Sequence, residues 1–180
     1  PDRDAARIRM ARTLLEQGHV NEAIEQLRKL PQTEEHSIGP LAQPHWFEPV
    51  VAQLVLRRAL DEADSMLALT GPVADRSPKL RALSANVMVL RGDPEGAIAT
   101  WASIRSSDPD MQVQVYHELA TLYMMTGRVE EAEVQAREGL ILEPDRWQVR
   151  LLLAESLLEQ GRSGEALDEV RLWPTAVGEL

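Results

Sequence analysis

Residues 116–144, YHELATLYMMTGRVEEAEVQAREGLILEP, decide the fold. Gly127 divides this stretch into two segments of helical length. Leu119, Ala120 and Tyr123 form an apolar stripe on the first segment. Glycine ends helices readily because it adopts the left-handed backbone conformation at little cost. The stretch therefore predicts two antiparallel helices joined by a tight turn.

The same pattern returns along the chain. Counted from each turn glycine, one alanine stands five residues later, another stands seven residues earlier, and a large apolar residue stands four residues earlier. The turn glycines are Gly18, Gly92, Gly127 and Gly161, and the large apolar residues before them are Leu14, Met88, Tyr123 and Leu157. The later alanines are Ala23, Ala97, Ala132 and Ala166. The earlier alanines are Ala11, Ala85, Ala120 and Ala154. The long gap after Gly18 leaves room for one more unit, with its turn at Arg58 and its later alanine at Ala63.

This pattern resembles the tetratricopeptide repeat, a helix–turn–helix unit of 34 residues. The alanine pairs carry the resemblance, together with Pro109 and Pro144, each seventeen residues beyond a turn glycine. The resemblance implies an all-α fold, a right-handed superhelical solenoid of about five repeats and about ten helices. The repeats are expected within a single domain over 1–180, near 4–37, 44–77, 78–111, 113–146 and 147–180.

Apolar periodicity and breaker residues predict where each helix begins and ends. The expected helices are 4–17, 21–30, 44–56, 59–69, 78–90, 94–104, 111–125, 129–142, 146–159 and 163–172. Asn21, Asp145 and Ser163 are the expected N-caps, because short polar side chains accept hydrogen bonds from free amides at a helix start.

An insertion over residues 31–44 separates the first two repeats, and Gly39-Pro40 marks a turn within it. Insertions in solenoids often contribute to partner binding, and the alternative is a short plug that only fills the gap. The tail over 174–180 is expected to fray. The last helix exposes an apolar stripe that nothing long enough follows, so we expect either a segment of a larger protein or a second copy to cover it.

Composition narrows the classes of function. The absence of cysteine excludes disulfides, thiolate metal sites and a cysteine nucleophile. A net charge of −10 disfavours nucleic acid and anionic membranes as partners, because both require a basic face. Surplus acid attracts a partner with a basic segment, or it serves only solubility. The chain shows no apolar run long enough to insert in a membrane and no signal peptide, which leaves a soluble protein of either cytoplasm or periplasm.

In the tetratricopeptide family, the first helix of each repeat lines a concave groove that holds a partner segment. Such a groove suits an extended or helical peptide of a protein partner. The groove residues that the resemblance implies are Ile8, Arg9, Arg12, Glu48, Ala52, Lys79, Ala82, Asn86, His117, Thr121, Leu151 and Glu155.

The carboxylate clamp of the chaperone-binding members is not matched. Lys79 and Asn86 fit the clamp, but Glu118 stands where an asparagine is required. Gln148 and Leu152 replace the two basic residues of the final repeat. We therefore do not expect binding of a peptide through its terminal carboxylate.

Catalytic and metal-binding patterns are weak. His36 and His45 could bind zinc with neighbouring carboxylates, but their separation within a loop is not a ligand spacing, which favours exposed loop histidines. The sequence HELAT after Tyr116 lacks the second histidine of a helical zinc motif. Phosphate-cradling loops, serine elbows and dinucleotide fingerprints are absent from the sequence. The sequence predicts no enzyme activity, no metal and no cofactor.

We therefore expect a non-catalytic scaffold that binds other proteins. One alternative is a self-assembling module, in which the uncovered C-terminal stripe stacks on another copy to give a homo-oligomer. Another is an accessory domain of a larger enzyme or of a secretion or assembly machine. The partner's identity does not follow from these residues.

Overall fold

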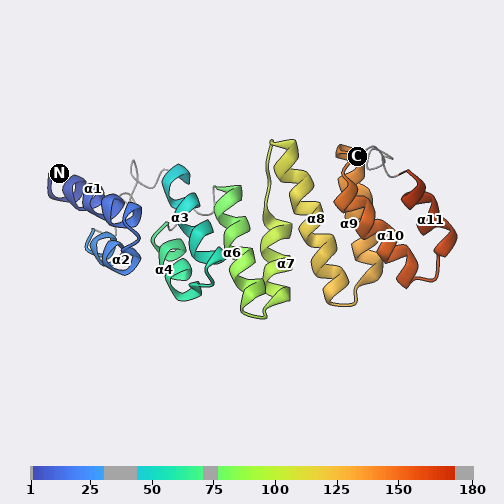
Figure 1. Ribbon diagram of the computed structural model, residues 1–180, viewed down its shortest axis with the longest axis horizontal. Helices are drawn as coiled ribbons and strands as arrows, with labels where there is room; N and C mark the ends of the chain where they lie inside the picture. The colour runs from blue at the N-terminus through green and yellow to red at the C-terminus, as the bar shows by residue number, and fades with distance from the viewer. Residues whose placement is uncertain (1, 31–43, 71–76, 173–180) are drawn as a thin grey trace, which may run out of the picture. The chain divides into compact units, whose positions relative to one another are not determined.

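The computed structural model describes residues 2–30, 44–70 and 77–172. These ranges form ten α-helices and contain no β-strand, which confirms the all-α fold. The chain divides into two compact units, Pro1–Asp93 and Pro94–Leu180. Figure 1 shows the helices in chain order. One domain over 1–180 stays a prediction, and the two helices expected to form the third repeat belong to different units.

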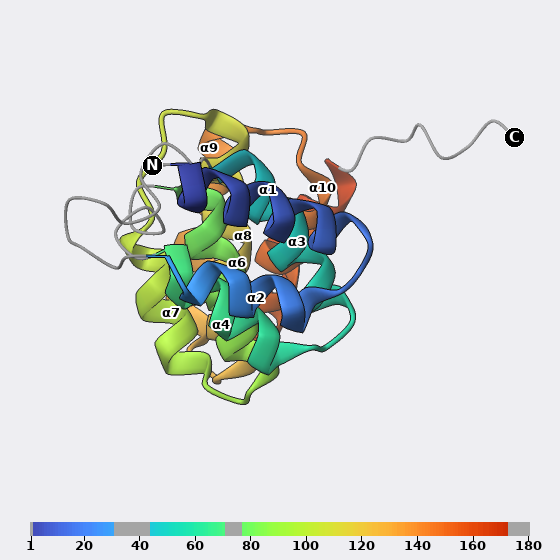
Figure 2. The same cartoon turned by 90° about the vertical axis from the view of Figure 1, so that its left-hand side faces the viewer.

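Unit 1 is built from antiparallel helix pairs. In the part of the unit that the structure describes, its helices are α1 (Asp2–Glu16), α2 (Val20–Arg28), α3 (Pro44–Leu56), α4 (Leu60–Thr70) and α6 (Pro78–Leu90). Helix α1 packs against α2, and Figure 2 shows this pair facing the viewer. Helix α3 packs against both α4 and α6, and α2 packs against α4.

Unit 2 follows the same plan. Its helices within the described ranges are α7 (Pro94–Ser103), α8 (Pro109–Met125), α9 (Val129–Leu142), α10 (Trp147–Glu159) and α11 (Ser163–Arg171). Each of these packs against the next along the chain, and α8 also packs against α10. All ten helices agree with their expected bounds to within two residues.

Main-chain hydrogen bonds of one type close all five turns within the helix pairs. At Gly127, the amide of Arg128 donates to the carbonyl of Tyr123 at 2.8 Å, and the glycine amide donates to Met124 at 3.1 Å. This is the Schellman arrangement, which requires a left-handed residue after the helix. The four turn glycines have φ between +73° and +81°. Arg58 has φ +57° and makes the same bonds, which confirms the turn of the degenerate repeat.

Small residues let the paired helices approach each other. The alanine five residues after each turn is fully or almost fully buried, including Ala63 of the degenerate repeat. At Gly139 on α9 the neighbouring helices leave almost no room for a side chain. A Cβ atom there would lie 3.1 Å from Val149 Cγ1 on α10 and 3.3 Å from Tyr116 Cβ on α8. Position 139 therefore brings three helices of unit 2 together.

The expected N-caps are wrong at three helices. His19, Arg146 and Arg162 occupy the cap positions, and none of their side chains accepts a capping hydrogen bond. Asn21 and Ser163 lie inside their helices, and Asp145 precedes its helix by two residues.

Side-chain caps occur instead where the connection between repeats supplies a suitable residue. The Ser77 hydroxyl accepts from the Leu80 amide at 3.3 Å, and Asp108 Oδ1 accepts from the Asp110 amide at 3.2 Å. In both helices a proline follows the cap and occupies the first turn, where its missing amide leaves no bond unmade.

Several expectations fall outside the described ranges. They concern the insertion up to residue 43 with His36, and the tail over 174–180. Among the helices that the structure describes, none has the length and hydrophobicity that a bilayer crossing requires.

Candidate functional site

Four of the expected groove residues belong to two helices of unit 2 that pack against each other. His117 and Thr121 are one helical turn apart on α8, and Leu151 and Glu155 are one turn apart on α10, which packs against α8. Extending each series by one turn reaches Met125 and Glu159, and both are exposed. We call these six residues the α8–α10 face. Sequence reasoning missed Met125 and Glu159, although the same four-residue spacing would have found them.

The acidic surplus is concentrated in this half of the chain. Residues 94–180 contain seven basic and 16 acidic residues, a net charge of −9, whereas residues 1–93 contain 12 basic and 13 acidic residues, a net charge of −1. Almost all of the net negative charge therefore belongs to residues 94–180.

The carboxylates of α11 are neutralised by arginines, whereas, within the described ranges, those of α10 are not. On α11, Glu165, Asp168 and Glu169 each pair with an arginine. Glu155 and Glu159 on α10 have no hydrogen-bond or ion-pair partner among the described residues. The uncompensated negative charge of α10 thus lies on the α8–α10 face.

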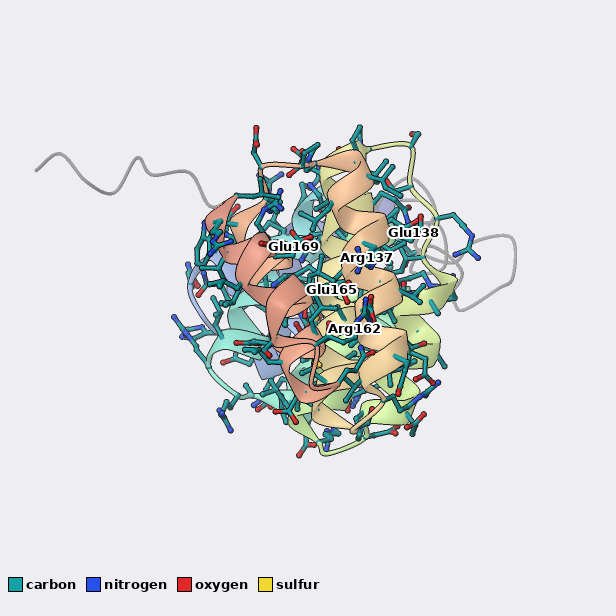
Figure 3. The ribbon with its side chains drawn as sticks, turned by 90° about the vertical axis from the view of Figure 1, so that its right-hand side faces the viewer. Arg137, Glu138, Arg162, Glu165 and Glu169 are labelled. Atoms are coloured by element: carbon teal, nitrogen blue, oxygen red, sulfur yellow. The ribbon has the colours of Figure 1, made fainter. Side chains whose placement is uncertain are left out.

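An ion-pair network joins α9 to Arg162 in the α10–α11 turn and, through Arg137 and Glu165, to α11 (Figure 3). Glu133 accepts hydrogen bonds from Arg162 at 2.7 Å, Gln160 at 2.8 Å and Arg137 at 2.9 Å. Burial raises the pKa of the Glu133 carboxyl, but these three hydrogen bonds outweigh burial and leave the pKa below its ordinary value. The hydrogen bond from Arg162 likewise lowers the pKa of Glu165. The network links consecutive repeats and leaves none of these carboxylates free for a ligand.

Arg150 adds a second brace within unit 2. Its guanidinium donates to Glu169 on α11 at 2.6 Å and to the carbonyl of Pro144, which precedes α10. The side chains of Arg150 and Glu169 are only 12% and 20% exposed. The pair therefore holds α11 against α10 from a largely buried position.

In unit 1, two of the expected groove residues are buried. Ile8 is 7% exposed and packs in the core of unit 1, and Ala82 is 6% exposed. We therefore remove them from the candidate set. Leu152, weighed for the clamp, is half-buried and packs against the core of unit 2.

The other unit 1 candidates are accessible, but some are already engaged. Arg12 donates to Glu16 at 3.0 Å, and Glu48 accepts a hydrogen bond from the Ser77 hydroxyl at 2.8 Å. The remaining candidates have exposed or half-buried side chains: Arg9, Ala52, Lys79 and Asn86. Their role in a groove stays a prediction.

The described histidine and carboxylate side chains form no metal-binding cluster. In residues 2–30, 44–70 and 77–172, no three histidine or carboxylate side chains are grouped so that they could hold an ion. His117 Nδ1 lies 3.7 Å from Glu118 Oε1, a local pair on α8.

A family model described as tetratricopeptide repeat matches residues 117–177, which include the α8–α10 face. Within these residues the chain is similar to the tetratricopeptide repeat. No curated protein sequence matches the chain.

Solved structures share the fold of the repeat protein. One structure of MamA, from AMB-1, is 17% identical with a TM-score of 0.69, over 99% of this chain and 94% of that one. Another structure of MamA is 11% identical with a TM-score of 0.70, over 95% and 90%. PilF of Pseudomonas aeruginosa is 15% identical with a TM-score of 0.67, over 99% and 78%. At these identities the likeness concerns the fold alone.

Proposed function

We propose that this repeat protein is a non-catalytic scaffold, and that its α8–α10 face binds a basic segment of a partner protein. The observation that supports the proposal most directly is the unpaired acid of α10. Glu155 and Glu159 share one face of that helix and lack a counter-ion among the described residues, although seven arginines belong to the same unit.

The apolar residues of the α8–α10 face provide a surface on which the partner segment can pack. Met125 at the end of α8 is exposed, and Leu151 on α10 is half-buried. Methionine adapts to different apolar partners because its side chain is unbranched and polarisable. A helix or strand that alternates leucine-like and lysine-like side chains matches both the apolar and the acidic members.

The proposal can be tested with a capped amphipathic peptide of lysine and leucine, compared with its glutamate–leucine counterpart. Binding is measured by fluorescence anisotropy at about 50 and 500 mM salt, where screening differs strongly. We expect only the lysine peptide to bind, and more weakly at high salt. Glu155→Lys/Glu159→Lys should lower the affinity about tenfold, which corresponds to about 1.4 kcal/mol.

A matched control separates this face from general attraction. Glu130 and Glu138 on α9 are exposed and also lack a partner in the described ranges, so Glu130→Lys/Glu138→Lys changes the net charge equally. This control should cost less than about twofold, as expected for distant screened charges. Equal losses in both variants would show that the peptide responds to the net charge of unit 2 and not to the α8–α10 face.

Self-assembly through α11 is the second candidate function. Leu167 and Val170 are 50% and 44% exposed, whereas Ile98 and Trp101, which occupy the same repeat positions on α7, are buried. A second copy that covered them would bury apolar surface, which favours association. Sedimentation across a concentration series should then show oligomers that Leu167→Glu/Val170→Glu removes. A constant monomer mass would reject this candidate. A role as the accessory part of a larger machine stays a prediction.

A further inference from the structure

Unit 1 contains an apolar cleft that none of the expected groove residues lines. It has a volume of about 480 Å³ and opens between the end of α1, the start of α2 and the middle of α3. Half-buried Leu15, Val20 and Val50 line it, together with buried Leu54. Ligand sites in proteins typically enclose about 300–1,000 Å³, so the cleft can admit a bulky side chain and its neighbours.

Packing explains why the cleft is open on this side. Helix α3 packs closely against α6 and α4, whereas α1 packs chiefly against α2. The apolar side chains of α1 and α3 therefore face each other across a gap. Filling the gap with an apolar group of a ligand would remove this surface from water, at about 25 cal/mol per Å².

The rim of the cleft carries one uncompensated positive charge. Arg57 lines the cleft, and its guanidinium has no hydrogen-bond or ion-pair partner in the described part of the chain. The rim carboxylate, Glu16, is already paired with Arg12 at 3.0 Å. The side-chain amides of Gln17 and Gln53 also line the cleft without partners among the described residues. A ligand that fits this rim brings a carboxylate beside Arg57 and peptide groups for the two amides.

We propose that this cleft binds a short segment of a partner protein in which a bulky apolar side chain adjoins a carboxylate. Arg57 and its exposed neighbour Arg58 repel a basic segment, so the charge preference is opposite to that of the α8–α10 face. A purely polar segment would leave the apolar walls in contact with water. The two sites would thus select different partners, and the cleft does not depend on the function proposed for unit 2.

The direct test uses the full chain and three capped peptides: acetyl-Glu-Leu-Leu-Glu-amide, its lysine counterpart, and its serine-for-leucine counterpart. Each peptide is titrated into isotopically labelled protein and followed by amide NMR shifts. We expect only the first peptide to shift the amides of Leu15, Gly18, Gln53 and Arg57 in a saturable way. Shifts confined to unit 2, equal shifts with all three peptides, or no saturable shift would overturn the proposal.

Two surface variants test the chemistry of the rim. Arg57→Glu should lower the affinity about fivefold or more, because an attraction becomes a repulsion. Gln53→Trp should fill the cleft and abolish binding, with circular dichroism confirming an intact helical fold. The matched control is Arg3→Glu, because Arg3 is an exposed arginine of unit 1 that neither lines the cleft nor belongs to the expected groove residues.

A further variant, Arg9→Glu, tests the expected groove, to which Arg9 belongs. If Arg9→Glu weakens binding and Arg57→Glu does not, the peptide lies at the expected groove positions and the proposal is wrong. Sedimentation of the protein without peptide tests whether a second copy of the chain occupies the cleft. An oligomer that Arg57→Glu dissociates would assign the cleft to a second copy of this chain instead of a foreign segment.

Discussion

The amide of Ala59 donates to the carbonyl of Leu54 at 2.9 Å, as the amide of Arg128 does to Tyr123 at 2.8 Å. The first bond closes a turn at arginine and the second closes a turn at glycine. An arginine in the left-handed conformation costs roughly 1 kcal/mol more than a glycine, because its Cβ crowds the following carbonyl. The turn at Arg58 therefore keeps its geometry against a local preference.

Replacing Arg58 with glycine should stabilise unit 1. We expect the free energy of unfolding to rise by roughly 0.5–1 kcal/mol, since relief of strain exceeds the added freedom of the unfolded chain. Chemical denaturation measures the change. Gly127→Arg is the mirror experiment and should cost a similar amount. No gain with Arg58→Gly would mean that its left-handed conformation is not strained.

Gly139 and Gly164 predict opposite effects of one added methyl group. At Gly139, alanine meets Val149 and Tyr116 within 3.3 Å, so Gly139→Ala should destabilise by about 1 kcal/mol despite its better helix propensity. At Gly164 on α11, nothing lies within 4 Å of the added Cβ. Gly164→Ala should therefore gain roughly 0.5 kcal/mol. Thermal melts compare the two variants, and changes of the same sign would contradict the close approach at position 139.

Glu133 should make the stability of the chain depend on pH. Its pKa lies below the ordinary 4.5 in the folded state, so the unfolded state binds protons first as pH falls. The stabilisation is complete above about pH 4.5 and is lost as pH falls through the lower folded pKa. Glu133→Gln should cost about 1–2 kcal/mol at pH 7 and flatten the acid limb of the stability profile.

The control for this prediction is Glu138→Gln on the same helix. Glu138 is exposed and has no partner among the described residues, so this variant should keep the stability and the pH profile of the parent protein. Identical acid limbs for Glu133→Gln and the parent would contradict the role of the network.

Arg150 should determine how firmly α11 is held. Arg150→Met keeps much of the apolar stem but leaves Glu169 without its partner, and we expect a loss of about 2 kcal/mol. Hydrogen exchange should show faster opening of α11 than of α8 or α9. Arg171→Met is the comparison, since Arg171 pairs with Asp168 at the surface and should contribute almost nothing. Uniformly faster exchange in unit 2 would contradict a local brace.

Sequence periodicity was sufficient for the helices because their ends depend on local features. Glycine, proline and apolar spacing mark each end, and even Arg58 was found from the position of Ala63. The caps were not predictable in the same way. His19 and Arg162 follow a Schellman turn, whose main-chain bonds already fix where the next helix begins. These helix starts therefore need no capping side chain, and a nearby polar residue such as Asn21 is easily mistaken for the cap.

The candidate site was predictable only in part. A family pattern places residues on helix faces, so His117, Thr121, Leu151 and Glu155 could be named in advance. Pairing and burial depend on neighbouring helices, and the sequence did not reveal that Ile8 and Ala82 are buried. Nor did it reveal the unpaired charge of Arg57 beside an apolar cleft, which requires the positions of α1 and α3 together.

Closure of the helix pairs by main-chain atoms has a consequence for divergence. Only one residue in each turn is restricted, and Arg58 shows that even this restriction can be relaxed. Side chains on the outer faces can therefore change with little effect on the backbone. Related repeats can acquire new partners by altering the chemistry of a face, while the order and spacing of their helices persist long after sequence similarity has faded.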